Sequence, residues 1–234
     1  MKKSSVAALI ITFIIIPLTL YLGTLLPGRW YYLTATLIVA ELLVPFLLAF
    51  EGRRPQAREL VVIAVMCAIA TASRLIIPIP HFKPIFAIIM LSGVAFGPEA
   101  GFLVGAVSAL ASDMFYMQGP YLPWQMMAYG IGGLLAGAVC RLKWLPRKPW
   151  VMGIFGFFTC VLVTGPLLDL CTAVLSLPTL SLSTVLPLLV SGVAVNISQG
   201  ACTFLTMLLF ADPLLEKLDR SKLKYGMMEG EDGL

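Results

Sequence analysis

The residues best suited to specific chemistry in this chain lie between His81 and Gln125. A loop near the start of this stretch carries His81 and Lys83, and a second polar and aromatic group follows about 30 residues later. That second group consists of Asp113, Tyr116, Gln118, Tyr121, Trp124 and Gln125. Amide groups beside aromatic faces suit a planar or amide-bearing ligand. These residues predict a binding site, with an interfacial belt of aromatic rings as the alternative.

Single residues of this stretch allow more than one role. Asp113 ends an expected helix, so it either contacts a ligand or marks the point where the helix meets water. His81 could coordinate a metal-bearing ligand or titrate near neutral pH, and an ordinary loop histidine is the alternative. Lys83 could pair with an anionic ligand group or with Asp113, and a solvated loop charge is its alternative.

A third polar group lies far along the chain. Asn196 and Gln199 are one turn apart on a single helix face. They either line the same cavity or bond a neighbouring helix within the bundle. Asp169, at the end of another apolar run, is a weaker candidate for the site.

The chain around these groups is almost uniformly apolar. Of its 234 residues, 59% are hydrophobic and 12% are charged, whereas about a quarter of the residues in soluble domains are charged. This composition is that of an integral membrane protein. Long apolar runs without strand alternation predict α-helices, because a segment in lipid must satisfy its own backbone hydrogen bonds.

Eight apolar runs can be interpreted as membrane-spanning helices. They cover residues 6–26, 30–50, 59–78, 84–97, 99–115, 123–140, 150–170 and 184–211. The fourth run is short and ends at Gly97-Pro98, a tight turn to the next run. The expected fold is therefore an all-α polytopic membrane protein of about eight helices, with six or seven as the alternative.

The positive charges predict how these helices are oriented. Thirteen of the 16 Lys and Arg residues precede the first run, follow the last, or lie between runs two and three or six and seven. The positive-inside rule then places both termini in the cytoplasm. The polar groups of residues 81–125 face outward in this orientation. The net charge of +4 follows from the same asymmetry and does not indicate nucleic-acid binding.

A charged stretch at residues 51–59 divides the chain. We expect a transmembrane hairpin at 1–52, a six-helix substrate-binding membrane domain at 53–224 and a disordered tail at 225–234. Glu41 lies within the hairpin and requires a partner that the sequence does not identify. The five scattered cysteines contain no CxxC pair, which favours packing over metal or disulfide chemistry. We expect no metal and no cofactor.

Two other function classes are weaker. An intramembrane aspartyl enzyme would use Asp113 and Asp169, but the GxGD-type context is missing. A carrier acting alone would need charges near the middle of the core spans, and the middle of each core span has none. The chain also has no GxxxxGK[ST] loop, so ATP hydrolysis by the usual P-loop route requires another protein.

Alanines at intervals of four open the expected six-helix domain: Ala64, Ala68 and Ala72. Small residues on one helix face allow another helix to approach closely. The approaching helix belongs either to the same chain or to a partner subunit.

The order of several motifs resembles the substrate-binding S-component of energy-coupling factor (ECF) vitamin transporters. The resemblance covers about residues 59–215 and is strongest over 59–140. The motifs that carry it are the alanine-spaced helix ending in Arg74, the Gly97-Pro98-x-x-Gly101 turn, Gly105, Ser108, Ser112-Asp113-Met114-Phe115, Gln118-Gly119-Pro120 and Pro123-Trp124-Gln125-Met126.

This resemblance implies a six-helix protein of a prokaryotic cytoplasmic membrane that binds a vitamin tightly at its outer face and has no catalytic activity. It also implies a transmembrane coupling subunit and two cytoplasmic ATPase subunits as partners. Ala64 and Ala68, or Ala68 and Ala72, would contact the coupling subunit. The two leading helices depart from the six-helix pattern.

The resemblance to the family does not by itself identify the vitamin. The segment from Gln118 to Met126 is most similar to proteins assigned to cobalamin or its precursors, which makes cobalamin the leading expectation. Riboflavin, a pyridoxine-type vitamin and a queuosine precursor are the alternatives.

Overall fold

The computed structural model describes residues 10–25, 33, 37, 41, 57–116, 119–176 and 181–225. All regular elements in these ranges are helical, and no strand occurs among them. In chain order they are the π-helical segment η1 (Ile11–Ile15), α2 (Ile16–Leu25), α4 (Ala57–Ile76), α5 (Ile85–Phe96), α6 (Pro98–Tyr116), α7 (Leu122–Arg141), α8 (Pro149–Thr159), the π-helical segment η2 (Cys160–Thr164), α9 (Gly165–Ser176) and α10 (Leu182–Tyr225). The all-α class predicted for this membrane protein is confirmed.

Three helical stretches of the described residues are long and apolar enough to cross a membrane. They are Arg58–Ile76, the continuous helix Pro149–Ser176 and Leu182–Lys224. The expected fourth span proves shorter: α5 has 12 residues and rises only about 18 Å, against a hydrocarbon core of roughly 30 Å. The expected second span is described only at Leu33, Leu37 and Glu41, so the count of eight stays a prediction.

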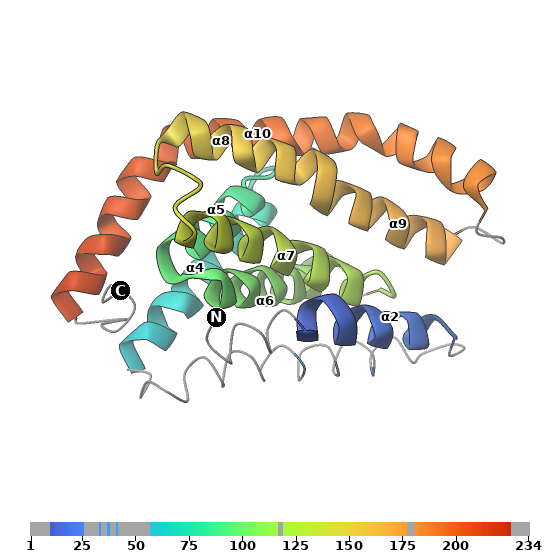
Figure 1. Ribbon diagram of the computed structural model, residues 1–234, viewed down its shortest axis with the longest axis horizontal. Coiled ribbons are helices and arrows are strands. Elements are labelled where there is room, and N and C mark those ends of the chain that lie inside the picture. The colour runs from blue at the N-terminus through green and yellow to red at the C-terminus, as the bar shows by residue number, and fades with distance from the viewer. Residues whose placement is uncertain are drawn as a thin grey trace.

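The last helix runs past the expected span of 184–211. It continues to Tyr225 with Pro213 inside it, because the residues after Pro213 include many strong helix formers such as Leu, Glu and Lys. The helix changes direction toward this red C-terminal end in Figure 1. A proline inside a helix removes one backbone hydrogen bond and causes such kinks.

Three helices of the domain approach one another through glycine. A Cβ atom on Gly93 of α5 or on Gly101 of α6 would collide with the carbonyl oxygen of Gly133 in α7, and one on Gly137 would lie 2.6 Å from Pro98 Cα. We call Gly93, Gly101, Gly133 and Gly137 the glycine seam. Helices in lipid associate through close packing of this kind, and every residue of α5 is buried as a result.

The turn between α5 and α6 is the tight one that the sequence predicts. Gly97 alone joins the two helices, with φ of 95°, a value that favours glycine. Its N–H donates to the carbonyl oxygen of Gly93 at 2.8 Å, and the N–H of Gly101 donates to the carbonyl oxygen of Gly97 at 3.0 Å.

The remaining helices surround this trio. α10 packs against α8 and α9, and together they lie on the side of α5–α7 opposite to α2 (Figure 1). α4 packs against α6 and α5. The ends of α4 and α6, the beginnings of α5, α7 and α9, and part of α10 form the walls of a cavity.

Candidate ligand-binding site

A cavity of about 510 Å³ lies among the helix ends. Its walls come from α4, the loop 77–84, α5, α6, α7, the continuous helix 149–176 and α10. The polar and aromatic lining residues are Arg74, His81, Lys83, Phe86, Tyr116, Gln125, Tyr129, Thr164, Asn196 and Gln199. The volume falls within the range of roughly 300 to 1,000 Å³ that is typical of small-molecule sites.

The structure brings together most of the residues that the sequence predicts for binding. His81, Lys83, Tyr116, Gln125, Asn196 and Gln199 all line the cavity. Asp113 lies behind the wall and contacts the lining residues Arg74 and Gln125. Residues 117 and 118, and so the candidate Gln118, lie outside the described part of the chain.

Two of the aromatic residues predicted for the site do not lie in the cavity wall. Trp124 is partly buried and packs against the apolar core, because the first turn of α7 directs its side chain into the bundle. Tyr121 precedes α7, and a Cβ atom on Gly119 would lie 2.5 Å from its ring. Neither side chain lines the cavity, so the structure does not support either as a wall residue.

An ion pair between α4 and α6 forms part of the wall. Arg74 Nη1 donates to Asp113 Oδ1 at 2.7 Å and to Ser112 Oγ at 2.5 Å. The Asp113 side chain has no exposed surface, and that of Arg74 is 14% exposed. The expectation that Asp113 meets water or pairs with Lys83 is therefore wrong. A buried carboxylate requires a hydrogen-bonded partner, and Arg74 is the partner that the fold supplies.

Gln125 binds the same carboxylate from α7. In the amide orientation that satisfies both groups, Gln125 Nε2 donates to Asp113 Oδ2 at 2.5 Å and to Oδ1 at 3.2 Å. Asp113 thus accepts hydrogen bonds from α4 and α7 while belonging to α6. One buried carboxylate ties three helices together at the cavity.

Two tyrosine rings flank the Arg74 guanidinium. Its Cζ lies 5.2 Å from the ring centroid of Tyr116 and 5.7 Å from that of Tyr129, within the range of cation–π attraction. The Tyr116 hydroxyl also donates to the Arg74 carbonyl oxygen at 3.1 Å. Phe86 contacts Tyr129 with ring centroids 4.5 Å apart. This side of the cavity is aromatic and holds a fixed cation.

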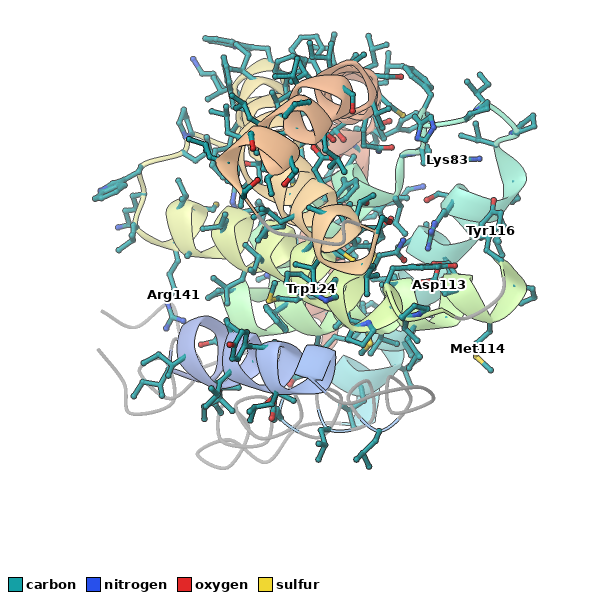
Figure 2. The ribbon with its side chains drawn as sticks, turned by 90° about the vertical axis from the view of Figure 1, so that its right-hand side faces the viewer. Lys83, Asp113, Met114, Tyr116, Trp124 and Arg141 are labelled. Atoms are coloured by element: carbon teal, nitrogen blue, oxygen red, sulfur yellow. The ribbon has the colours of Figure 1, made fainter. Side chains whose placement is uncertain are left out.

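Figure 2 shows that two neighbouring residues of α6, Asp113 and Met114, point in different directions. Asp113 points into the protein on the side where Tyr116 and Lys83 also lie, whereas the next residue, Met114, points away and is 69% exposed. Arg141 lies at the opposite side of the bundle. The cavity is therefore at one end of α6 and α7.

The facing wall comes from α10. Asn196 Nδ2 donates to Asp169 Oδ2 at 2.8 Å, and Gln199 Nε2 donates to the backbone carbonyl oxygen of Lys83. Lys83 Nζ in turn donates to the carbonyl oxygen of Ile77. The two roles left open for Asn196 and Gln199 thus coexist, since both line the cavity and both bond neighbouring elements.

The π-helical segment η2 adds wall residues that sequence reasoning missed. Cys160 and Thr164 line the cavity, and so does Gly165 at the start of α9. A Cβ atom on Gly165 would lie 2.5 Å from Asn196 Oδ1. Single π-helical turns are frequent at functional sites. Nothing in the sequence signals this segment.

Arg74 is the most informative of the missed residues. The sequence identifies it as the end of the first core helix and not as part of the site. The sequence feature that could have identified it is a cation at the end of an expected span, on the side where the charge count also places Asp113.

The two carboxylates considered for an aspartyl enzyme do not bond each other. Asp113 pairs with Arg74, and Asp169 accepts a hydrogen bond from Asn196.

The alanine face of α4 points away from the cavity. Ala64 and Ala68 are exposed, and Ala72 is half-buried. Exposed apolar residues flank them, among them Val61, Val65 and Ile69.

Comparison with known proteins identifies the family. The family described as the S component of the ECF-type riboflavin transporter matches residues 55–218. UPF0397 proteins of Vibrio atlanticus (strain LGP32) and Aliivibrio salmonicida (strain LFI1238) are each 36% identical over 87 residues, which cover 35% of this chain and 47% of each relative. The chain thus spans about half the length of the curated relatives it matches, and no solved structure matches it. With 164 consecutive residues matched, the chain belongs to the family of ECF-type riboflavin transporter S components.

Proposed function

We propose that this chain is the membrane-embedded, high-affinity substrate-binding subunit of an ECF-type importer. The observation that carries the proposal is the cavity of about 510 Å³, which six helices line and where amide groups and aromatic rings converge. Its walls lie at the helix ends that the positive-inside rule assigns to the external side. The chain would therefore span the membrane several times with both termini in the cytoplasm, and it would capture its ligand from outside.

The ligand that we propose is a vitamin of flavin size, with riboflavin as the first choice. The rings of Phe86, Tyr116 and Tyr129 offer faces for a planar heterocycle. The leading expectation of cobalamin has no support in the family match, which names riboflavin. A corrinoid also has several times as many non-hydrogen atoms as a flavin, and the cavity suits the smaller molecule.

The test is to purify the full chain in detergent without added ligand and to analyse what co-purifies by absorption and mass spectrometry. Calorimetry with riboflavin, cobalamin and pyridoxine follows on the ligand-free protein. We expect a bound flavin and tight binding of riboflavin alone. A protein that binds none of the three vitamins would overturn the proposal, and binding of cobalamin alone would overturn the flavin assignment.

A partner surface belongs to the same proposal. The exposed alanine face of α4 would contact the transmembrane coupling subunit, which would associate with two ATPase subunits in the cytoplasm. A leucine at Ala68 would keep two helices apart at this face. We expect Ala68→Leu to abolish riboflavin uptake and co-purification of the coupling subunit, while the Kd for riboflavin stays within about twofold.

A matched control for this variant is Val65→Leu, which adds one methylene group to the same exposed face. It should retain uptake, because Val65 is already a bulky residue. If Ala68→Leu instead weakens ligand binding, the alanines serve packing within the chain and the docking proposal is wrong.

A further inference from the structure

Arg74 uses only part of its hydrogen-bonding capacity. A guanidinium has five N–H donors, and both hydrogen bonds of the Arg74 side chain leave from Nη1. Its Nε and Nη2 have no hydrogen-bond partner among the residues that the structure describes. The side chain is 14% exposed and lines the cavity. Its remaining donors are therefore available to an acceptor on a bound molecule.

The guanidinium is also held in one orientation. Asp113 and Ser112 fix Nη1, while the rings of Tyr116 and Tyr129 lie 5.2 and 5.7 Å from Cζ. A planar, fixed fork of donors recognises two neighbouring acceptors at once. Preorganisation of this kind lowers the entropic cost of binding.

The charge of Arg74 is already balanced. Asp113 Oδ1 lies 2.7 Å from Nη1, and this carboxylate is completely buried. An anionic ligand would add a second negative charge to a pair whose net charge is zero. A neutral ligand with hydrogen-bond acceptors adds none, so the free donors suit neutral acceptors best.

We propose that Arg74 determines ligand specificity: its Nε and Nη2 bind one edge of a neutral, planar heterocycle that presents a ring nitrogen beside a carbonyl oxygen. A flavin ring has two such edges, one at N1 and one at N5. Asp113 and Gln125 act as positioning residues for the guanidinium. This inference rests on the proposed function, since it names the chemistry by which the same cavity recognises its vitamin.

The test compares three flavins on two proteins. Riboflavin, 1-deazariboflavin and 5-deazariboflavin differ only at the two ring nitrogens, and each is titrated into the full-length wild-type protein and into Arg74→Lys. Lysine keeps the positive charge beside Asp113 but lacks the planar pair of donors. We expect the wild-type protein to bind one of the two analogues about tenfold or more weakly than riboflavin.

In Arg74→Lys we expect riboflavin affinity to fall about ten- to hundredfold, and the preference for riboflavin over that analogue to disappear. A purely structural role of Arg74 would weaken all three ligands equally and keep the preference. Such a result overturns the inference. Equal binding of all three flavins by the wild-type protein overturns it as well.

A second variant covers the case in which Arg74→Lys does not fold. The double change Arg74→Gln with Asp113→Asn removes both charges together and leaves no unpaired ion in the bundle. It should purify as a monodisperse protein and bind riboflavin and the analogue with the same weakened affinity. Wild-type affinity and preference in either variant contradict the inference but leave the proposed function standing. A wild-type protein that binds no flavin contradicts the proposed function itself.

Discussion

The glycine seam and the cavity share the helices α5, α6 and α7, yet they follow opposite principles. Toward one end, α5, α6 and α7 touch through backbone atoms at Gly93, Gly101 and Gly133. Toward the other end, α6 and α7 carry Asp113, Gln125 and a ring of polar contacts around an open space. The first region has no room for a Cβ atom, whereas the second has room for a ligand.

The difference explains how a cavity keeps its shape in a membrane. Lipid supplies no hydrophobic force that pulls helices together, so the helices are fixed where their backbones interlock. At the cavity, buried hydrogen bonds to one carboxylate join α4, α6 and α7. The seam provides rigidity, and the polar wall provides the geometry that recognition requires.

The largest effect should come from a side chain in the seam. In Gly133→Val, the new Cβ collides with the backbone of Gly101, which cannot rotate away. We expect a loss of about 3 kcal/mol of stability, the upper end of the usual cost of overpacking, seen as aggregation or a strongly lowered Tm in detergent. Gly132→Ala is the control, because its Cβ would meet side-chain atoms and no backbone, the nearest being Thr164 Cγ2 at 3.2 Å. A wild-type Tm for Gly133→Val would disprove the close approach.

The next effect concerns the carboxylate that holds the cavity open. Asp113→Ala leaves the Arg74 cation nearly buried without its partner, which should cost about 3 to 5 kcal/mol. Thermal unfolding in detergent and calorimetry with riboflavin should both register the loss. Met114→Ala, one residue along the same helix and 69% exposed, should unfold and bind like the wild-type protein. If the two variants behave alike, the ion pair does not organise the site.

A smaller effect is expected for Gln125→Ala, which removes hydrogen bonds to Asp113 from one side only. Arg74 stays paired, so the stability loss should be about 1 to 2 kcal/mol. Riboflavin affinity should fall about tenfold, because the guanidinium loses part of its support and the cavity loses a wall residue. Titration calorimetry measures the affinity. An unchanged Kd would show that Gln125 serves packing alone.

The smallest effect should come from an ion pair outside both regions. Arg147 Nη1 lies 3.3 Å from Asp219 Oδ2, and both side chains are well exposed. Water and salt screen such pairs, so Asp219→Ala should cost less than about 0.5 kcal/mol. Its Tm should hardly change between low and high salt. A large loss would mean that the end of α10 supports the seam directly.

Composition and apolar runs were sufficient to predict the helices, because lipid leaves few alternatives to a helix. They predicted α5 as a short helix, but they do not show whether this 12-residue helix, buried on all sides, crosses the membrane. Apolar sequence predicts burial, and it does not distinguish burial in lipid from burial in protein. The Gly97 turn was predictable because a positive φ favours one residue type.

The site was predictable only where polar residues stood out against an apolar background. Asn196 and Gln199 were found in this way, and so were Gln125 and Tyr116. Arg74 was missed as a site residue because its partner is 39 residues away, and a cation at a helix end is commonly a solvated anchor. The sequence also predicts Trp124 in the cavity, although it packs against the core. An aromatic ring at the start of a helix suits either place, and the sequence does not distinguish them.

The π-helical segment η2 has a consequence for the face that α9 presents. One extra residue in a helical turn rotates everything after it by about 100° relative to an uninterrupted α-helix. Asp169 follows η2 by five residues and reaches Asn196 from there. An uninterrupted helix would turn this carboxylate away and present a different flank to α10. The extra residue in η2 thus decides whether Asn196, on the far wall of the cavity, finds a carboxylate partner on α9.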